Sequence, residues 1–200
     1  WDYGTGALGD VGCHLIDIPF RTLGLKYPIS AECSVGNVYS KMWSPDYIPE
    51  GCPPSSFITL NFEATKKSKK PIQMTWSDGG IRPPHPEIIP ANNDIGGKNS
   101  ENGVLIIGEK GIISTNINDS SPLMPKLYLY DGTTDFGPEV EKMAEPEYGH
   151  QRKWADACKA GFKSKEHLEL TSSFDYAGPM TETVLMGNLA IRSFMLRKEL

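Results

Sequence analysis

Three side chains near the start of the chain have the types and the spacing for proton transfer. Asp10, His14 and Asp17 stand at positions i, i+4 and i+7, so on one α-helix all three would project from the same face. An imidazole gains and loses a proton near neutral pH, and a nearby carboxylate fixes its tautomer. Asp10 and His14 are therefore a candidate pair for removing the proton of a hydroxyl group.

The same spacing also fits two roles that involve no proton transfer. Asp10 belongs to the residue types that cap helix N-termini, and His14 would then be a core histidine with its hydrogen bonds satisfied. Alternatively, His14, Asp10, Asp17 and one distant histidine would suit zinc or manganese. Because the sequence has no second pair of ligands at helical spacing, we predict no metal site.

A glycine-rich segment leads directly into this polar stripe. Gly4, Gly6 and Gly9 are dense enough to mark a loop with positive φ angles or a close approach to a ligand. Their letters fit Gly-x-Gly-x-x-Gly, which makes Gly6 and Gly9 candidate cofactor contacts, but no strand precedes them as a dinucleotide-binding turn requires. We interpret the segment as a substrate loop. The flanking aromatic residues Trp1 and Tyr3 either line the pocket or are merely exposed.

A second candidate segment covers residues 76–84. The aromatic ring of Trp76, the carboxylate of Asp78, two glycines and the guanidinium of Arg82 suit a sugar, because the ring can stack on the sugar face while charged groups hold its hydroxyls. The alternative is a strand end followed by a proline-rich surface loop. His150 stands at a predicted helix start, where a histidine is commonly just exposed.

Helices must position these groups at both ends of the chain. A helical pattern is predicted from Asp10 to a stop at Gly24, with Pro19 expected to kink or divide it. Two further helices are predicted at 150–161 and 177–200. The longer one should bury an apolar stripe made of Met180, Val184, Leu185, Leu189, Ile191 and Phe194.

Between the helices the pattern changes to short alternating segments. The predicted strands, rich in β-branched and aromatic residues, are 29–39, 55–64, 71–76, 103–107, 111–115 and 126–130, with a hairpin turn at 108–111. Ile58, Leu60 and Phe62 alternate with less apolar residues, which predicts a sheet covered on one side. The fold class is therefore α+β, with one open, mostly antiparallel sheet and helices mainly on one of its faces. Two long irregular segments, 77–102 and 132–146, are predicted binding loops or disordered inserts.

Composition and charge limit the classes of function. The chain of 200 residues has 20 Lys and Arg against 25 Asp and Glu, and its lysine cluster at 66–70 lies where a turn is expected, so we predict no nucleic-acid partner. No apolar run approaches the ~18–20 residues of a membrane span, and we predict no membrane partner. Four scattered cysteines fit a reducing compartment, but the sequence leaves cytoplasm and periplasm both open.

The segment GTGALGDVGCHLID resembles the signature of the Gfo/Idh/MocA family of nicotinamide-dependent sugar oxidoreductases. That signature is a glycine-rich stretch followed by Asp-x-x-x-His-x-x-Asp, and the chain matches it without a gap. Residues 76–80 are similar to a Trp-x-Asp-Gly-Gly stretch of related members, and the order of elements is similar along nearly the whole chain. The resemblance implies a single C-terminal domain, residues 1–200, with a fold like that of the C-terminal domain of glyceraldehyde-3-phosphate dehydrogenase. The N-terminal Rossmann domain would be absent from this chain.

The resemblance also implies roles for the candidate residues. His14 would be the general base on a hydroxyl while a hydride leaves the same carbon for NAD or NADP, and Asp10 would orient His14 or hold the hydroxyl. The other contacts to a sugar, a polyol or a derivative would come from Asp17, Trp76, Asp78, Arg82, Trp1, Tyr3 and His150. The family's Glu-Lys-Pro lysine and its nucleotide-binding fingerprint are absent from this sequence. The cofactor would therefore be held mainly by the protein's own Rossmann domain, and this chain alone should not turn over.

Two alternatives stay open beside the dehydrogenase. One is a glycosidase of the same family that uses NAD transiently, oxidising and re-reducing its substrate during bond cleavage. The other is a non-catalytic module for dimerisation and carbohydrate binding. In either case the resemblance implies a homo-oligomer formed through the sheet.

Overall fold

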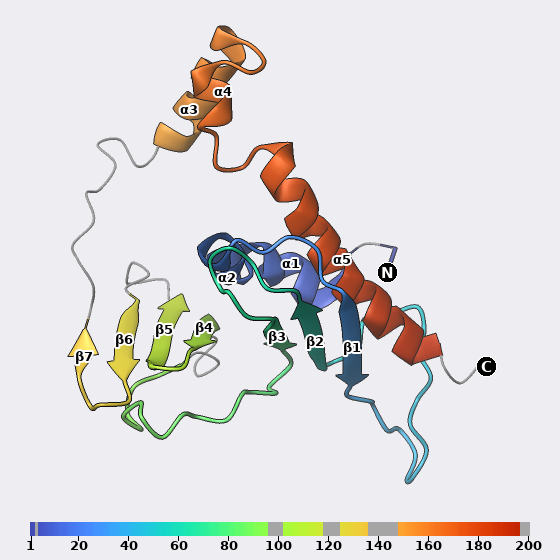
Figure 1. Ribbon diagram of the computed structural model, residues 1–200. Coiled ribbons are helices and arrows are strands. Elements are labelled where there is room, and N and C mark those ends of the chain that lie inside the picture. The colour runs from blue at the N-terminus through green and yellow to red at the C-terminus, as the bar shows by residue number, and fades with distance from the viewer. Residues whose placement is uncertain (3, 96–101, 118–124, 136–147, 197–200) are drawn as a thin grey trace. The chain divides into compact units, whose positions relative to one another are not determined.

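The computed structural model describes residues 1–2, 4–95, 102–117, 125–135 and 148–196 (Figure 1). Tyr3, one of the predicted substrate contacts, and most of the irregular segment 132–146 lie outside the described residues. The sequence predicts one domain, whereas the contacts divide the chain into two compact units. The first consists of Trp1–Gly137 and Met180–Leu200, and the second consists of Pro138–Pro179.

Two short helices open the chain, α1 at Gly6–Leu15 and α2 at Asp17–Leu23. The predicted helix start at Asp10 is wrong, because Gly6, with a φ of 68°, lets the backbone turn into the helix earlier. The predicted division near Pro19 is confirmed, since α2 begins just before the proline and places it in a first turn that needs no N–H donor. Gly24, with a left-handed φ of 65°, ends α2 as predicted.

The first sheet contains three antiparallel strands in the order β1–β2–β3. They are Ser30–Val35, Ser56–Phe62 and Ile72–Ser77. The predicted buried face is confirmed, because Ile58, Leu60 and Phe62 are each no more than 2% exposed. Ser56 belongs to the same face by the two-residue period of the strand and is also 2% exposed. A polar residue thus occupies a core position at the start of the central strand.

The buried face of this sheet is covered by α1 and by α5, the helix Phe174–Leu196 (Figure 1). Gly187 of α5 lies where the three elements meet. A Cβ atom added to Gly187 would come 2.6 Å from a methyl carbon of Leu8 in α1 and 3.6 Å from one of Ile58 in β2. The missing side chain therefore lets two helices and a strand pack closely, which is why a glycine occupies the middle of a long helix.

The buried side of α5 differs in part from the predicted stripe. Val184 and Ile191 are buried as expected, but Leu185 and Leu189 are 44% and 66% exposed. The other buried positions of α5 carry small or polar residues, namely Thr183, Gly187 and Asn188. The apolar pattern was misleading because close helix packing selects small side chains. Thr183 is fully buried and donates its hydroxyl to the carbonyl of Lys26 at 3.0 Å.

The other strands form a second sheet in the order β4–β5–β6–β7, so the predicted single sheet is wrong. These antiparallel strands are Asn102–Ile107, Gly111–Ile117, Lys126–Leu129 and Thr134–Asp135. The predicted hairpin turn is confirmed by the bond from the Gly108 N–H to the Gly111 carbonyl at 2.9 Å. The segment between the sheets contributes to the core of the second sheet, because Ile89 and Ile95 pack against Ile112 and Tyr128.

The second unit, Pro138–Pro179, contains α3 at Gly149–Ala160, α4 at Lys165–Leu168 and the start of α5. The helix predicted at 150–161 is confirmed, whereas α4 was not predicted. Trp154, Phe162 and Leu168 are large apolar residues of this unit and are 65%, 80% and 71% exposed. Among the described residues of both units, no helix combines the length and the apolar character needed to cross a bilayer.

Candidate functional site

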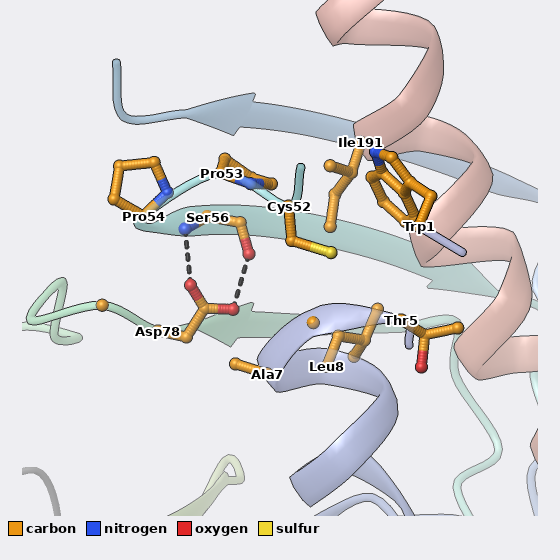
Figure 2. A pocket seen from close by; sticks show the side chains of 12 residues that line it. Trp1, Thr5, Ala7, Leu8, Cys52, Pro53, Pro54, Ser56, Asp78 and Ile191 are labelled. Atoms are coloured by element: carbon orange, nitrogen blue, oxygen red, sulfur yellow. Dashed lines mark hydrogen bonds between the residues drawn. The ribbon is translucent and has the colours of Figure 1, made fainter. Parts of the chain in front are cut away.

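A pocket of about 140 Å³ lies between the start of α1 and the start of β2 (Figure 2). Five stretches of the first unit, distant from one another in sequence, line it. They contribute Trp1, the residues Thr5, Gly6, Ala7 and Leu8, the residues Cys52, Pro53, Pro54 and Ser56, the pair Asp78 and Gly79, and Ile191. Trp1 and Asp78 are the predicted substrate contacts that the structure brings to this pocket.

Asp78 is held in the pocket wall by three hydrogen bonds. Its Oδ1 accepts from the Ser56 N–H at 2.6 Å and its Oδ2 accepts from the Ser56 hydroxyl at 2.7 Å (Figure 2). Its Oδ2 also accepts from the Trp76 indole N–H at 2.7 Å. The backbone N–H of Asp78 also donates to the Ser56 carbonyl at 3.0 Å. A carboxylate has about four acceptor positions, so about one position on Oδ1 is left for a ligand. Asp78 therefore shapes the wall and can still bind.

Trp76 takes part in this wall from the protein interior. It is 9% exposed, and its indole N–H is satisfied by Asp78. Almost none of the ring is available to solvent, so the geometry does not support the predicted stacking of a sugar on Trp76. The buried indole instead packs in the core and fixes the carboxylate that faces the pocket.

Gly79 lets the turn after β3 touch the segment before β2. Its φ is 63°, and a Cβ atom added to it would come 2.1 Å from the carbonyl oxygen of Pro54. No side chain fits there, because backbone atoms block the space. The neighbouring Gly80 has a φ of 90° but open space around it. The first glycine of the pair is thus required by close packing as well as by its backbone angle.

The glycines of the first loop also have packing roles. Thr5 precedes α1 without capping it, and its hydroxyl lies over Gly9, where an added Cβ atom would come 1.4 Å from Oγ1. Gly6 packs against Cys52, with 3.2 Å between an added Cβ atom and the thiol sulfur. These contacts explain Gly6 and Gly9 without any cofactor. The first N–H groups of α1, which have no intrahelical acceptor, receive none from the Thr5 side chain.

Asp10 and His14 lie on α1 but outside the pocket. Both side chains are exposed, so the alternative of a buried core histidine is wrong. Ala7, which lines the pocket, is three residues before Asp10 and seven before His14, so the three share one face of the helix. Within the part of the chain that the structure describes, neither side chain has a hydrogen-bond partner. The predicted pair therefore forms an open polar stripe that begins at the pocket.

Asp17 does not share a helix with this pair. The helix is interrupted at Ile16, and Asp17 begins α2. There its carboxylate forms an ion pair with Arg21, one turn further on, at 3.3 Å. The predicted three-residue stripe is therefore reduced to two residues, and Asp17 has a local partner. No group of three potential metal ligands is found in the described ranges.

Arg82 lies at a different pocket, which also includes His85, Asn93 and Asp94 and has a volume of about 180 Å³. The ring nitrogens of His85 lie 3.2 Å from the Pro86 carbonyl and 3.1 Å from the Asn93 carbonyl, so this side chain ties the loop together. The structure therefore does not bring Arg82 to the pocket that Asp78 lines, and its role as a substrate contact stays a prediction. Gly79 and Gly80 turn the chain away between the two residues.

Trp1 and His150 complete the set of predicted contacts. The Arg192 guanidinium lies 5.5 Å from the Trp1 ring centre, and the indole N–H of Trp1 is buried with no acceptor among the described residues. This donor is unusual, since buried polar groups are normally paired. His150 is exposed in the first turn of α3, within the second unit, and its role as a substrate contact stays a prediction.

Sequence reasoning missed Ser56, Thr5 and Cys52 as pocket residues. A signal for Ser56 existed, because the two-residue period of the strand places a serine on the face shared by Ile58 and Leu60. A polar residue at a core position needs a partner, and Asp78 supplies it. Thr5 and Cys52 carry no such local signal, since their meeting depends on packing between distant segments.

Comparisons with known proteins leave the family open. No protein-family model matches the chain, and no curated protein matches its sequence significantly. The functional argument therefore rests on the residues and on the geometry of the site.

Proposed function

We propose that this chain is the substrate-facing domain of an NAD(P)-dependent oxidoreductase that acts on a sugar, a polyol or a derivative. We further propose that it is related to the C-terminal domains of the Gfo/Idh/MocA family and shares their glyceraldehyde-3-phosphate dehydrogenase-like fold. The observation that carries the proposal is the exposed pair Asp10 and His14, which shares a helix face with a pocket containing a partly free carboxylate. The α+β architecture supports it.

His14 acts as the general base in this proposal. Its imidazole takes the proton of a substrate hydroxyl, the carbon–oxygen double bond forms, and a hydride leaves the same carbon. NAD or NADP, when bound, supplies the acceptor for that hydride. The solvent exposure of His14 supports the role, because a base must come within hydrogen-bond distance of the hydroxyl. Asp10, one helical turn earlier, orients the imidazole or holds the hydroxyl.

The cofactor would be bound mainly by a nucleotide-binding domain outside this chain. The one glycine pattern of the right form uses Gly6 and Gly9 for internal packing, which leaves this chain a minor part in binding a dinucleotide. That domain would also cover the exposed stripe on α1 and order its side chains. A covered stripe would exclude water from the hydride-transfer step.

Self-association through the first sheet is the second part of the proposal. The outer face of the sheet carries a row of hydrogen-bonded side chains across all three strands. Asn61 of β2 donates to Ser30 of β1 at 3.0 Å and accepts from Gln73 of β3 at 3.2 Å. These hydrogen bonds pair the polar side chains with one another within the sheet, which suits contact with an identical surface.

The intact protein tests this proposal directly. It should be incubated with a panel of sugars and polyols together with NAD or NADP while nicotinamide absorbance is followed. Reduction of the cofactor with at least one member is the expected result. If sugars bind without any change in absorbance, the oxidoreductase proposal fails and a carbohydrate-binding module is left. Cleavage of a glycoside without net reduction would instead identify the glycosidase.

A further inference from the structure

We infer that the pocket at the start of α1 binds an uncharged, hydroxyl-bearing end of the substrate and excludes anionic sugars. The inference rests on the proposed function and narrows its substrate class. It distinguishes neutral sugars and polyols from uronic acids and sugar phosphates, all of which contain hydroxyl groups that His14 could deprotonate. Three properties of the pocket carry it, namely its charge, its unused hydrogen-bonding groups and its size.

The charge of the pocket opposes an anion. Among the residues that the structure places around it, Asp78 carries the one charged side chain. Arg192 lies behind the Trp1 ring, and its guanidinium is bonded to the Pro49 carbonyl outside the pocket lining. A phosphate or carboxylate group in the pocket would therefore face a carboxylate, with no cationic side chain among the lining residues to offset it. Like charges in contact at a partly desolvated site are strongly unfavourable.

The unused hydrogen-bonding groups suit a hydroxyl. Asp78 Oδ1 retains about one acceptor position. The first-turn N–H groups of α1 receive no capping bond from the Thr5 side chain and are therefore donors for a ligand, whereas the Trp1 indole N–H is buried away from solvent. A hydroxyl group can both donate to the carboxylate and accept from an N–H group. An anion would only accept, and an apolar group would leave both sides unpaired.

The size and the walls of the pocket suit one end of a sugar. Its volume of about 140 Å³ is smaller than the ~300–1,000 Å³ of pockets that enclose a whole ligand, so a dinucleotide does not fit. Ala7 and Pro53 supply accessible apolar surface for the C–H groups of a ring edge or a hydroxymethyl group, while Leu8 and Ile191 are buried beneath it. The rest of the substrate then extends along α1 toward Asp10 and His14.

Alkylation of Cys52 in the intact protein tests the inference without using turnover. Cys52 lines the pocket and Cys158 is exposed in α3, so both thiols are open to iodoacetamide and Cys158 serves as the internal control. The probes are glucose and sorbitol against glucuronate, gluconate and glucose 6-phosphate. We expect the neutral probes to slow modification of Cys52 but not of Cys158, and the anionic probes to need at least about tenfold higher concentration for the same protection. Equal protection by both classes, or no protection by either neutral probe, overturns the inference.

A pocket-filling variant adds a second test. Cys52→Leu places a larger side chain beside Gly6, so KM for a neutral substrate should rise about tenfold or more while kcat changes little. Cys158→Leu makes the same change at an exposed thiol in the second unit and should leave KM unchanged. An unchanged KM in Cys52→Leu also overturns the inference. If neutral probes protect Cys52 but the intact protein shows no turnover, the inference about the pocket stands and the oxidoreductase proposal fails. If neutral and anionic sugars are turned over equally, the oxidoreductase proposal stands and the inference about the pocket fails.

Discussion

The pocket and the exposed stripe meet on α1 but hold their polar groups in opposite ways. In the pocket wall, Asp78 accepts three hydrogen bonds and is tied to two strands of the sheet. On the stripe, Asp10 and His14 are exposed and have no hydrogen-bond partner in the described ranges. The difference separates two tasks. Groups that define the shape of a site are held in place by hydrogen bonds within the fold. Groups that exchange protons with a substrate must stay accessible, and the bound substrate or a covering domain then fixes their orientation.

Replacing His14 should give the largest effect on activity. In the intact protein, His14→Ala should lower kcat/KM by about 10²–10⁴ because the general base is lost. The urea midpoint should stay unchanged, since the side chain is exposed. His85→Ala, which affects the second pocket, is the control and should retain turnover. Normal turnover in His14→Ala would remove this residue from the mechanism.

Replacing Asp78 should give the largest effect on stability. Asp78→Ala leaves the Ser56 N–H, the Ser56 hydroxyl and the Trp76 indole N–H without their acceptor, so the free energy of unfolding should fall by about 3 kcal/mol. The measurement is urea denaturation followed by circular dichroism. Asp10→Ala is the matched control and should change stability by less than about 0.5 kcal/mol. If the two variants are equally stable, the proposed contrast between wall and stripe is lost.

Substitutions at the two glycines after Asp78 distinguish the cost of a steric clash from the cost of an unfavourable backbone angle. Gly80→Ala should destabilise the protein by about 1 kcal/mol, because its φ of 90° is unfavourable for alanine while the surrounding space is open. Gly79→Ala meets the Pro54 carbonyl as well, and should cost at least about 2 kcal/mol. Thermal or urea unfolding measures both. Equal losses would mean that the turn can move away from the segment before β2.

The smallest expected effect is a pH dependence at a third carboxylate, Asp131. Its Oδ1 accepts from the Thr133 N–H at 2.9 Å and from the Thr133 hydroxyl at 2.8 Å, and these bonds hold the pKa of Asp131 below its ordinary value of 3.8. Because the folded-state pKa is lowered, the bonds stabilise the turn between β6 and β7 above the ordinary pKa. Their contribution is lost as the pH falls through the lowered value. Titration by NMR should show the Thr133 amide shift changing only in that acidic window, and a midpoint at or above 3.8 would contradict this assignment.

Local patterns were sufficient to predict much of the fold. The burial of Ile58, Leu60 and Phe62, the helix end at Gly24 and the hairpin turn at 108–111 each depend on neighbouring residues, and all three are confirmed. The helical spacing of Asp10 and His14 was predicted for the same reason. The start of α1 was placed too late, because the glycines predicted a loop up to Asp10, whereas the helix already begins at Gly6.

The pocket could not be predicted, because it depends on contacts between distant segments. Ser56 and Asp78 meet only through the antiparallel register of β2 and β3, and the meeting of Thr5 with Cys52 depends on how α1 packs against the sheet. The single sheet was wrong for a related reason. A sequence pattern finds strands but does not show that Ile89 and Ile95 fill a separate core between them.

The contact of Gly79 with the Pro54 backbone has a consequence for how a ligand enters. Together with the bonds of Asp78 it locks the pocket wall in its final shape before anything binds. A ligand then has no loop to order, and little conformational entropy is lost there on association. We therefore expect binding at this pocket to be a single kinetic phase, with no slow closing step after encounter.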